Sequence, residues 1–180
     1  CGNQCRFYSC GNFLRGDVGV GVIFMKIKIV AVGKVKEKFF LQAIEEYLKR
    51  CSRFARTEVR EVPETLFKGV PNSAETETIL KQEGRLLLEN AEGFVVAMDT
   101  AGKMLSSTEM AETVKRAMQT HSTFTFLIGG SYGLSEEVRQ RADVRWSLGA
   151  VTLPHQLARV VTAEQIYRIL AINNNVGYHK

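Results

Sequence analysis

The stretch TFTFLIGGSYGLSEEVRQ, residues 123–140, contains the pattern that decides the fold. Its first part, Thr123 to Ile128, is rich in β-branched and aromatic side chains and predicts a strand. Gly129 to Gly133 predicts a glycine-rich turn, and Ser135 is placed to cap a short helix that ends near Asp143. A strand that passes through a tight turn into a helix is the unit from which α/β proteins with parallel sheets are built.

The same alternation continues on both sides of this stretch. Residues 63–74 contain two prolines and a glycine and predict a loop, and residues 99–102 predict a turn. From hydrophobic periodicity we expect strands at residues 26–32, 57–62, 94–98 and 145–148, and helices at residues 37–53, 75–90, 106–120 and 154–172. The alternation predicts an α/β fold with a mostly parallel sheet that is covered by helices on both faces.

The composition is that of an ordinary globular domain. The chain has 180 residues, of which 45% are hydrophobic and 24% are charged, so it is long enough for one domain with a buried core. No apolar run approaches the roughly 20 residues that cross a bilayer. The formal net charge of +5 is compatible with a polyanionic partner but does not require one.

The first 24 residues differ from the rest of the chain. They hold three of the four cysteines and five of the fifteen glycines, show no periodicity, and lack the features of a secretory signal. Met25 then opens the first predicted strand. We therefore interpret residues 1–24 as a non-native or disordered N-terminal extension and residues 25–180 as one domain, with no further boundary inside it.

The cysteines allow one alternative interpretation. Cys1, Cys5 and Cys10 could ligate a metal, but their spacing matches no established ligand motif. Cys51 lies on the apolar face of a predicted helix and is expected to be a buried thiol, which is typical of a reducing compartment. We expect no metal site, because no cluster of His, Asp and Glu has ligand spacing.

The turn Gly129 to Gly133 is the first candidate binding element. Glycines there let the backbone approach a ligand closely, and the next helix begins with free amides. The turn lacks the Gly-x-Gly-x-x-Gly order of dinucleotide-binding proteins and the Gly-Lys-Ser/Thr of phosphate loops. A ligand-binding turn and a simple connection between strand and helix both remain open.

The stretch LGAVTLPH, residues 148–155, is the second candidate. Its apolar loop should be buried, either by folding back on the core or by contact with an adenine-like ring. His155 lies in the first turn of the last predicted helix, where the helix N-terminus favours neutral imidazole. Arg159 follows four residues later on the same face. The pair either contacts an RNA phosphate or a developing anion, or belongs to a solvated helix face.

The chain ends in Gly177-Tyr178-His179-Lys180, a combination that suits contact with an unpaired base and its phosphates. A frayed tail is the alternative. His121 follows a predicted helix and is interpreted as a C-terminal cap.

Five segments, in this order, resemble the bacterial RlmH family of the SPOUT superfamily. They are MKIKIVAVGK (25–34), AMDTAGKMLSS (97–107), LIGGSYGLS (127–135), WSLGAVTLPHQLARVVTAEQIYR (146–168) and the terminal GYHK. Those enzymes methylate N3 of a pseudouridine in large-subunit (23S) ribosomal RNA of assembled ribosomes, using S-adenosylmethionine. The resemblance covers essentially all of residues 25–180, and the first 24 residues have no counterpart in it.

The resemblance implies a Rossmann-like, mostly parallel sheet with a C-terminal deep trefoil knot, in a cytoplasmic homodimer without metal or membrane. By position, the residues that bind S-adenosylmethionine are Met98, Gly129, Leu148, Gly149, Ala150, Val151, Thr152 and Leu153. The expected catalytic group on the RNA side is His155, Arg159, Tyr178 and His179, and replacing Arg159 by Ala is expected to reduce turnover more than cofactor binding. Gly149 stands where serine is frequent in the family, which is expected to affect the loop and not activity.

Three other functions are alternatives. A non-catalytic ribosome-binding factor would bind RNA without binding S-adenosylmethionine. A methyltransferase of the same superfamily that modifies transfer RNA would act on naked RNA and would not need assembled ribosomes. A nucleotide-binding oxidoreductase is disfavoured, because the glycine fingerprint is missing and no acidic residue follows the turn by about 20 positions.

Overall fold

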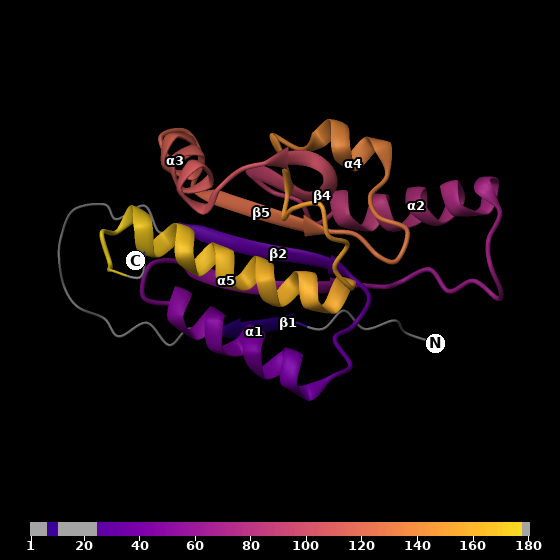
Figure 1. Cartoon of the computed structure of the whole chain (residues 1–180), viewed down its shortest axis with the longest axis horizontal. Coiled ribbons are helices and arrows are strands. Elements are labelled where there is room, and N and C mark those ends of the chain that lie inside the picture. Colours follow the sequence, from indigo (N-terminus) through magenta and orange to yellow (C-terminus); the bar gives the residue numbers. More distant parts are fainter. Residues whose placement is uncertain (1–6, 11–24, 178–180) are drawn as a thin grey trace.

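The computed structural model describes residues 7–10 and 25–177 of the chain. A six-stranded sheet with the order β1-β3-β2-β5-β4-β6 forms the centre of these residues (Figure 1). The strands are β1 (Phe7–Cys10), β2 (Lys26–Val32), β3 (Arg56–Val62), β4 (Phe94–Met104), β5 (Thr123–Ile128) and β6 (Val144–Ser147). All neighbouring pairs from β3 to β6 are parallel, and only β1 is antiparallel to its neighbour β3. The predicted mostly parallel sheet is confirmed.

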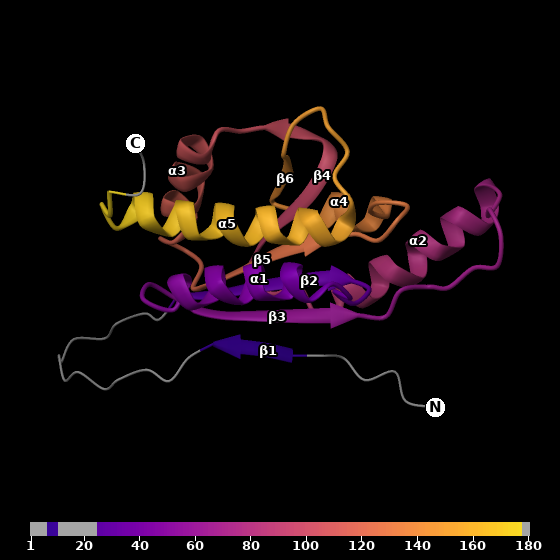
Figure 2. The same ribbon diagram turned by 60° about the horizontal axis from the view of Figure 1, so that its bottom comes forward.

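Helices cover both faces of this sheet. They are α1 (Lys38–Cys51), α2 (Ser73–Leu88), α3 (Ser107–Ala117), α4 (Glu136–Arg141) and α5 (His155–Asn173). Side chains alternate along β2, so Ile27 and Ile29 pack in a core with α1, α3 and α5, whereas Val30 and Val32 pack in a second core with α2 and α4. Helices α1 and α5 lie side by side on the first face (Figures 1 and 2).

Two elements differ from the sequence-based expectations. Strand β4 does not stop at Met98. It continues to Met104 through an irregularity in which both Met98 and Lys103 pair with Trp146, so the predicted turn is a bulge inside a longer strand. Strand β1 lies in the predicted extension and was not expected. The rest of residues 1–24 lies outside the described residues, and the interpretation of that segment as non-native stays a prediction.

The helix caps and the first core match the predictions made from the sequence more closely. Ser106 and Glu109 form the expected capping box of α3, and the Ser135 side chain caps α4. The backbone N–H of His121 donates to the Ala117 carbonyl just after α3. Cys51 is buried in the first core, and burial raises its pKa to about 12, so it is the inert thiol that the sequence predicts.

The carboxyl ends of β2, β3 and β5 meet at one edge of the sheet, which lies on the right in Figures 1 and 2, whereas β4 turns away from this edge after its bulge. Helices α1 and α5 both begin at this edge, and the Lys36 backbone N–H donates to Gln156 Oε1 at 2.9 Å, which joins the residue just before the N-cap of α1 to the first turn of α5. Ligands of open α/β sheets bind at such an edge, in loops that follow the strands. The fold therefore brings the loops with the predicted site residues together.

Neither a membrane span nor a metal centre is found in the part of the chain that the structure describes. No helix among these residues combines the length and apolarity that crossing a bilayer requires. The same residues contain no group of three or more His, Cys, Asp or Glu side chains that could hold a metal ion. Cys1 and Cys5 of the alternative metal-binding interpretation lie outside the described residues.

Candidate active site

A pocket of about 610 Å³ opens at the carboxyl edge of the sheet. Its volume falls within the roughly 300–1,000 Å³ that is typical of small-molecule sites. Its walls come from the β4 bulge, the glycine turn after β5 and the loop between β6 and α5. Seven of the eight residues predicted to bind the cofactor line this pocket: Met98, Gly129, Leu148, Gly149, Val151, Thr152 and Leu153. Ala150 belongs to the same loop but is exposed outside the pocket lining.

Main-chain atoms of the glycine turn form one wall of the pocket. A Cβ at Gly129 would lie 2.0 Å from the carbonyl oxygen of Gly133, so no other residue fits there without moving the turn. The turn closes through a hydrogen bond from the Gly133 N–H to the Gly130 carbonyl at 3.2 Å. Of the two interpretations left open for this turn, its position in the pocket wall favours the ligand-binding one.

The apolar loop after β6 forms another wall of the pocket. Gly149 has φ +120, a backbone conformation that side chains disfavour, and the Ser147 hydroxyl hydrogen-bonds both the N–H and the carbonyl of Gly149. Leu148 packs against the first core, whereas Val151 is 72% exposed, so folding back on the core buries only part of this loop. For the exposed part, contact with a ligand ring stays a prediction, which is consistent with an exposed apolar side chain in the lining of a pocket.

A buried carboxylate, Asp99, holds the β4 bulge, and no motif in the sequence pointed to a function for it. Asp99 accepts hydrogen bonds from Arg139 Nε at 3.2 Å, Arg145 Nε at 2.9 Å and the Ala101 N–H at 3.1 Å. Burial raises the pKa of Asp99, but the Ala101 N–H and the two guanidinium groups outweigh burial and lower its pKa overall. Asp99 therefore stays ionised and holds Arg139, another pocket-lining residue, at the polar end of the pocket.

His155 is the first residue of α5 and lines the pocket. Its pKa lies below the usual value, first because the ring is partly buried and then because Arg159 and Lys36 are nearby cations, while Glu64 opposes them. The imidazole is therefore neutral near pH 7, as the sequence analysis predicted. The main cause is desolvation, whereas the prediction rested on the helix N-terminus.

Arg159 lies in the interior beneath His155. It is 1% exposed, and its Nη1 atom donates to Glu61 Oε1 at 3.1 Å. Its Nη2 atom donates to the Gly33 carbonyl at 3.0 Å and also to the carbonyl of Val32. The solvated helix face considered in the sequence analysis is therefore wrong for Arg159. A guanidinium this deeply buried is placed to hold the loop after β2, and its predicted part in the reaction stays a prediction.

The other two predicted catalytic residues, Tyr178 and His179, lie outside the described residues. Gly177 is the last described residue before them, and it follows the C-terminal end of α5, whereas His155 begins that helix (Figure 1). Helix α5 has 19 residues. At about 1.5 Å per residue, a helix of this length separates its two ends by about 28 Å. Among the described residues, the structure therefore brings together His155 and Arg159 of the predicted catalytic group, and the roles of Tyr178 and His179 stay predictions.

Comparisons with known proteins show the family to which the chain belongs. Residues 25–179 match a family model described as predicted SPOUT methyltransferase. A protein of Oenococcus oeni named ribosomal RNA large subunit methyltransferase H is 43% identical over 159 residues, which are 87% of this chain and 99% of that protein. A protein of the same name from Lactiplantibacillus plantarum is 46% identical over 159 residues, 87% of this chain and 100% of the relative.

A solved structure supports the fold independently. A probable methylase family protein from Haemophilus influenzae superposes with a TM-score of 0.50, at 13% sequence identity, over 88% of this chain and 72% of that protein. An identity this low supports the fold alone. The trefoil knot that the resemblance implies is not tested by this superposition and stays a prediction.

The chain belongs to the SPOUT methyltransferase family, and it is a methyltransferase that uses S-adenosylmethionine. Within that family it belongs with the proteins named ribosomal RNA large subunit methyltransferase H, which it matches along nearly their whole length. The resemblance stated from the sequence is confirmed, and the oxidoreductase alternative is excluded by this membership.

Proposed function

We propose that this protein is a cytoplasmic enzyme that transfers a methyl group to N3 of a pseudouridine in large-subunit ribosomal RNA of assembled ribosomes. The observation that carries the proposal is the pocket at the carboxyl edge of the sheet, which is lined by seven of the eight predicted cofactor residues and by His155. The names of the relatives support large-subunit ribosomal RNA as the substrate class.

The pocket fits the chemistry of S-adenosylmethionine. Leu148, Leu153 and Ile128 offer apolar surface to the adenine ring, and Gly129 lets the main chain approach the ligand closely. Asp99 and its arginine partners supply charge at the polar end. When bound, S-adenosylmethionine supplies a methyl group that is already activated by its sulfonium. The task left to the protein is to position the base and to remove one proton.

His155 is the residue that we propose to act on that proton. The N3 atom of the base carries hydrogen, and this proton must leave as N3 gains the methyl group. Neutral imidazole can accept a proton, and the depressed pKa keeps His155 neutral near pH 7. Bulk water is the other acceptor. The base must be unpaired or flipped to expose N3, because pairing would cover that atom.

The geometry of α5 supports a homodimer. Tyr178 follows Gly177 directly, and two residues of extended chain reach only about 7 Å. The tail of one chain therefore cannot reach the His155 at the other end of its own helix, about 28 Å away by helix geometry. If Tyr178 and His179 act with His155, the tail must come from a second copy, and a twofold dimer provides two such sites.

The first test uses methyl-labelled S-adenosylmethionine and assembled ribosomes that lack the modification. We expect label at a pseudouridine of the large-subunit RNA, and no label on the same RNA without ribosomal proteins. Label on transfer RNA would favour the transfer RNA methyltransferase instead. Ribosome binding without any affinity for S-adenosylmethionine would contradict the proposal and favour a non-catalytic binding factor.

A mixing experiment tests the shared site. His155→Ala and Tyr178→Ala variants are each expected to be nearly inactive alone. After the two are mixed and allowed to exchange subunits, half of the dimers carry one intact site, so activity should return to about a quarter of wild type. No recovery in mixtures with demonstrated exchange would show that the tail does not serve a partner's pocket.

A further inference from the structure

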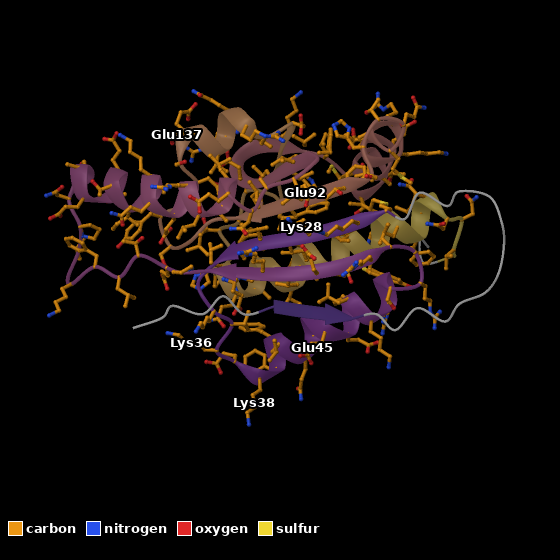
Figure 3. All side chains as sticks on the ribbon, turned by 180° about the vertical axis from the view of Figure 1, so that it is seen from behind. Lys28, Lys36, Lys38, Glu45, Glu92 and Glu137 are labelled. Atoms are coloured by element: carbon orange, nitrogen blue, oxygen red, sulfur yellow. The ribbon has the colours of Figure 1, made fainter. Side chains whose placement is uncertain are left out.

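Three lysines alternate along the loop that follows β2 and the first residue of α1. Lys34, Lys36 and Lys38 are exposed, whereas Val35 between them is buried. None of the three makes a salt bridge with another residue in the described ranges. Figure 3 shows the Lys36 and Lys38 side chains extending outward from the start of α1. We call residues 34–38 the lysine loop. The positive charges of its lysines are not neutralised by salt bridges within the described ranges.

The backbone of the lysine loop is anchored from inside. The Val35 N–H donates to the buried Glu61 carboxylate at 2.7 Å, and the Lys36 N–H donates to Gln156 at 2.9 Å. Arg159 binds the same Glu61 oxygen and the carbonyl groups that precede the loop. The backbone is thus fixed before any ligand arrives, so binding orders only the lysine side chains and loses less entropy.

The lysine loop also lies beside the mouth of the pocket. Gln156, its anchor, is the neighbour of His155, and Lys36 is close enough to be one of the cations that lower the His155 pKa. The first turns of α1 and α5 contain no acidic residue, so their N-terminal amides add to the positive field. Glu37, Glu61 and Glu64 are the acidic groups nearby. Glu61 is paired with Arg159, and Glu64 accepts a hydrogen bond from the Ser131 hydroxyl.

Phe39 extends this surface with an aromatic ring. It follows Lys38 in the first turn of α1 and is 60% exposed, which is unusual for a ring of this size in a helix that packs on a core. An exposed aromatic side chain next to lysines is the combination that binds single-stranded nucleic acid, because the ring stacks on a base while the ammonium groups contact phosphates. None of the three lysines lines the cofactor pocket, so the loop offers an open track and not an enclosed anion site.

We infer that the lysine loop is the docking surface for the RNA backbone next to the target nucleotide. Lys34, Lys36 and Lys38 contact phosphates, and Phe39 stacks on a flanking base, while the target base enters beside His155. This inference rests on the proposed function and adds to it the segment that holds the substrate. It also explains the buried Glu61–Arg159 ion pair, which holds the backbone of the lysine loop in place.

The test compares two triple variants that remove the same charge. The loop variant, Lys34→Gln/Lys36→Gln/Lys38→Gln, removes the three positive charges of the lysine loop. The control variant, Lys49→Gln/Lys81→Gln/Lys115→Gln, removes the charges of three exposed lysines in α1, α2 and α3. Ribosome affinity is measured by co-sedimentation over a series of salt concentrations, and the Kd for S-adenosylmethionine by calorimetry. The loop variant should bind ribosomes at least tenfold more weakly, with a salt slope reduced by about one per lysine. The control should match wild type.

The outcomes separate this inference from the proposed function. If wild type methylates ribosomes but the loop variant keeps the affinity and salt slope of the control, the lysine loop does not contact RNA. If the loop variant loses S-adenosylmethionine affinity to the same extent as ribosome affinity, the lysines support the pocket and the inference is also wrong. If wild type itself neither binds nor methylates ribosomes, the failure belongs to the proposed function.

Discussion

Two loops at the carboxyl edge of the sheet lead into neighbouring helices, yet they are held in opposite ways. The lysine loop before α1 exposes charged side chains, and its backbone is tied to the buried Glu61 and to Gln156. The loop of residues 148–154 before α5 exposes apolar side chains, with Val151 72% exposed. The lysine loop is held by hydrogen bonds to residues distant in the sequence, whereas the hydrogen bonds at the apolar loop are local ones between Ser147 and Gly149.

The difference follows from the ligand that each loop is proposed to meet. Phosphates bind well to charges that are already in place, because a fixed backbone reduces the entropy lost on binding. A cofactor that must enter a pocket and be covered needs a wall that can move, and walls with few buried contacts open at low free energy. Under this proposal, the buried Glu61–Arg159 ion pair fixes the lysine loop, which meets RNA, and the loop of residues 148–154, which covers the cofactor, stays adaptable.

The largest expected effect comes from breaking the anchor of the lysine loop. Arg159→Ala leaves the Glu61 carboxylate buried without its cation and removes a donor from the Gly33 carbonyl. Loss of one partner from a buried ion pair costs about 3–5 kcal/mol. Urea unfolding should therefore show a lower midpoint with an unchanged slope. If turnover fell while the free energy of unfolding stayed the same, Arg159 would act on RNA and not on the loop.

A second variant separates charge from hydrogen bonding at this anchor. Glu61→Gln keeps one oxygen that can accept from the Val35 N–H and from Arg159, but it removes the negative charge. We expect a smaller loss of stability than for Arg159→Ala, because the lysine loop keeps its hydrogen bonds. An equal loss in both variants would mean that the charge of the pair, and not the hydrogen bonds, holds the loop.

The next largest effect is expected at the glycine turn, which forms one wall of the pocket. Gly129→Ala places a methyl group 2.0 Å from the Gly133 carbonyl oxygen, so the glycine turn must shift. We expect S-adenosylmethionine affinity to fall about tenfold or more, which corresponds to about 1.4 kcal/mol. Calorimetry measures the Kd, and the melting temperature reports damage to the fold. Unchanged affinity would remove the glycine turn from the cofactor site.

Local patterns predicted most of this architecture. Strands at residues 26–32 and 123–128 have the predicted bounds, because apolar alternation and β-branched residues mark both ends. The capping signals at Ser106 and Ser135 likewise predicted where α3 and α4 begin. Helix α2 begins slightly earlier than predicted, since Asn72 and Glu75 form a capping box that the sequence analysis did not use.

Long-range partners could not be predicted in this way. Helical spacing correctly placed Arg159 on the face of His155, but its partner Glu61 lies 98 positions away, so the sequence could not show that this face is turned inward. Asp99 likewise follows a strand in a turn-like sequence, whereas its partners Arg139 and Arg145 come from the second half of the fold. Hydrophobic periodicity predicts which face of a helix or strand is apolar, but it does not predict which distant charged residue will pair with a buried charge on that element.

His155 lies where the two loops meet, and its titration measures their coupling. Its pKa lies below the ordinary value of about 6.5, so the imidazole is neutral above that pKa and protonated below it. If neutral imidazole accepts the N3 proton, turnover should fall as the pH drops through this pKa. His155→Asn should abolish the acid limb, and Lys36→Gln should shift it to higher pH because a nearby cation is removed. A limb that is unchanged in both variants would assign the proton to water.

The smallest expected effect lies in the adaptable loop. Gly149→Ala and Gly149→Ser introduce a side chain at φ +120 but meet no atom within 4 Å, so backbone strain is the main cost. Such strain costs about 1–3 kcal/mol when the surroundings enforce it. The loop has few anchors and can relax, so we expect a loss of S-adenosylmethionine affinity of only a few-fold and an unchanged free energy of unfolding. If stability fell as well, the apolar loop would be as firmly held as the lysine loop, and the contrast between them would not stand.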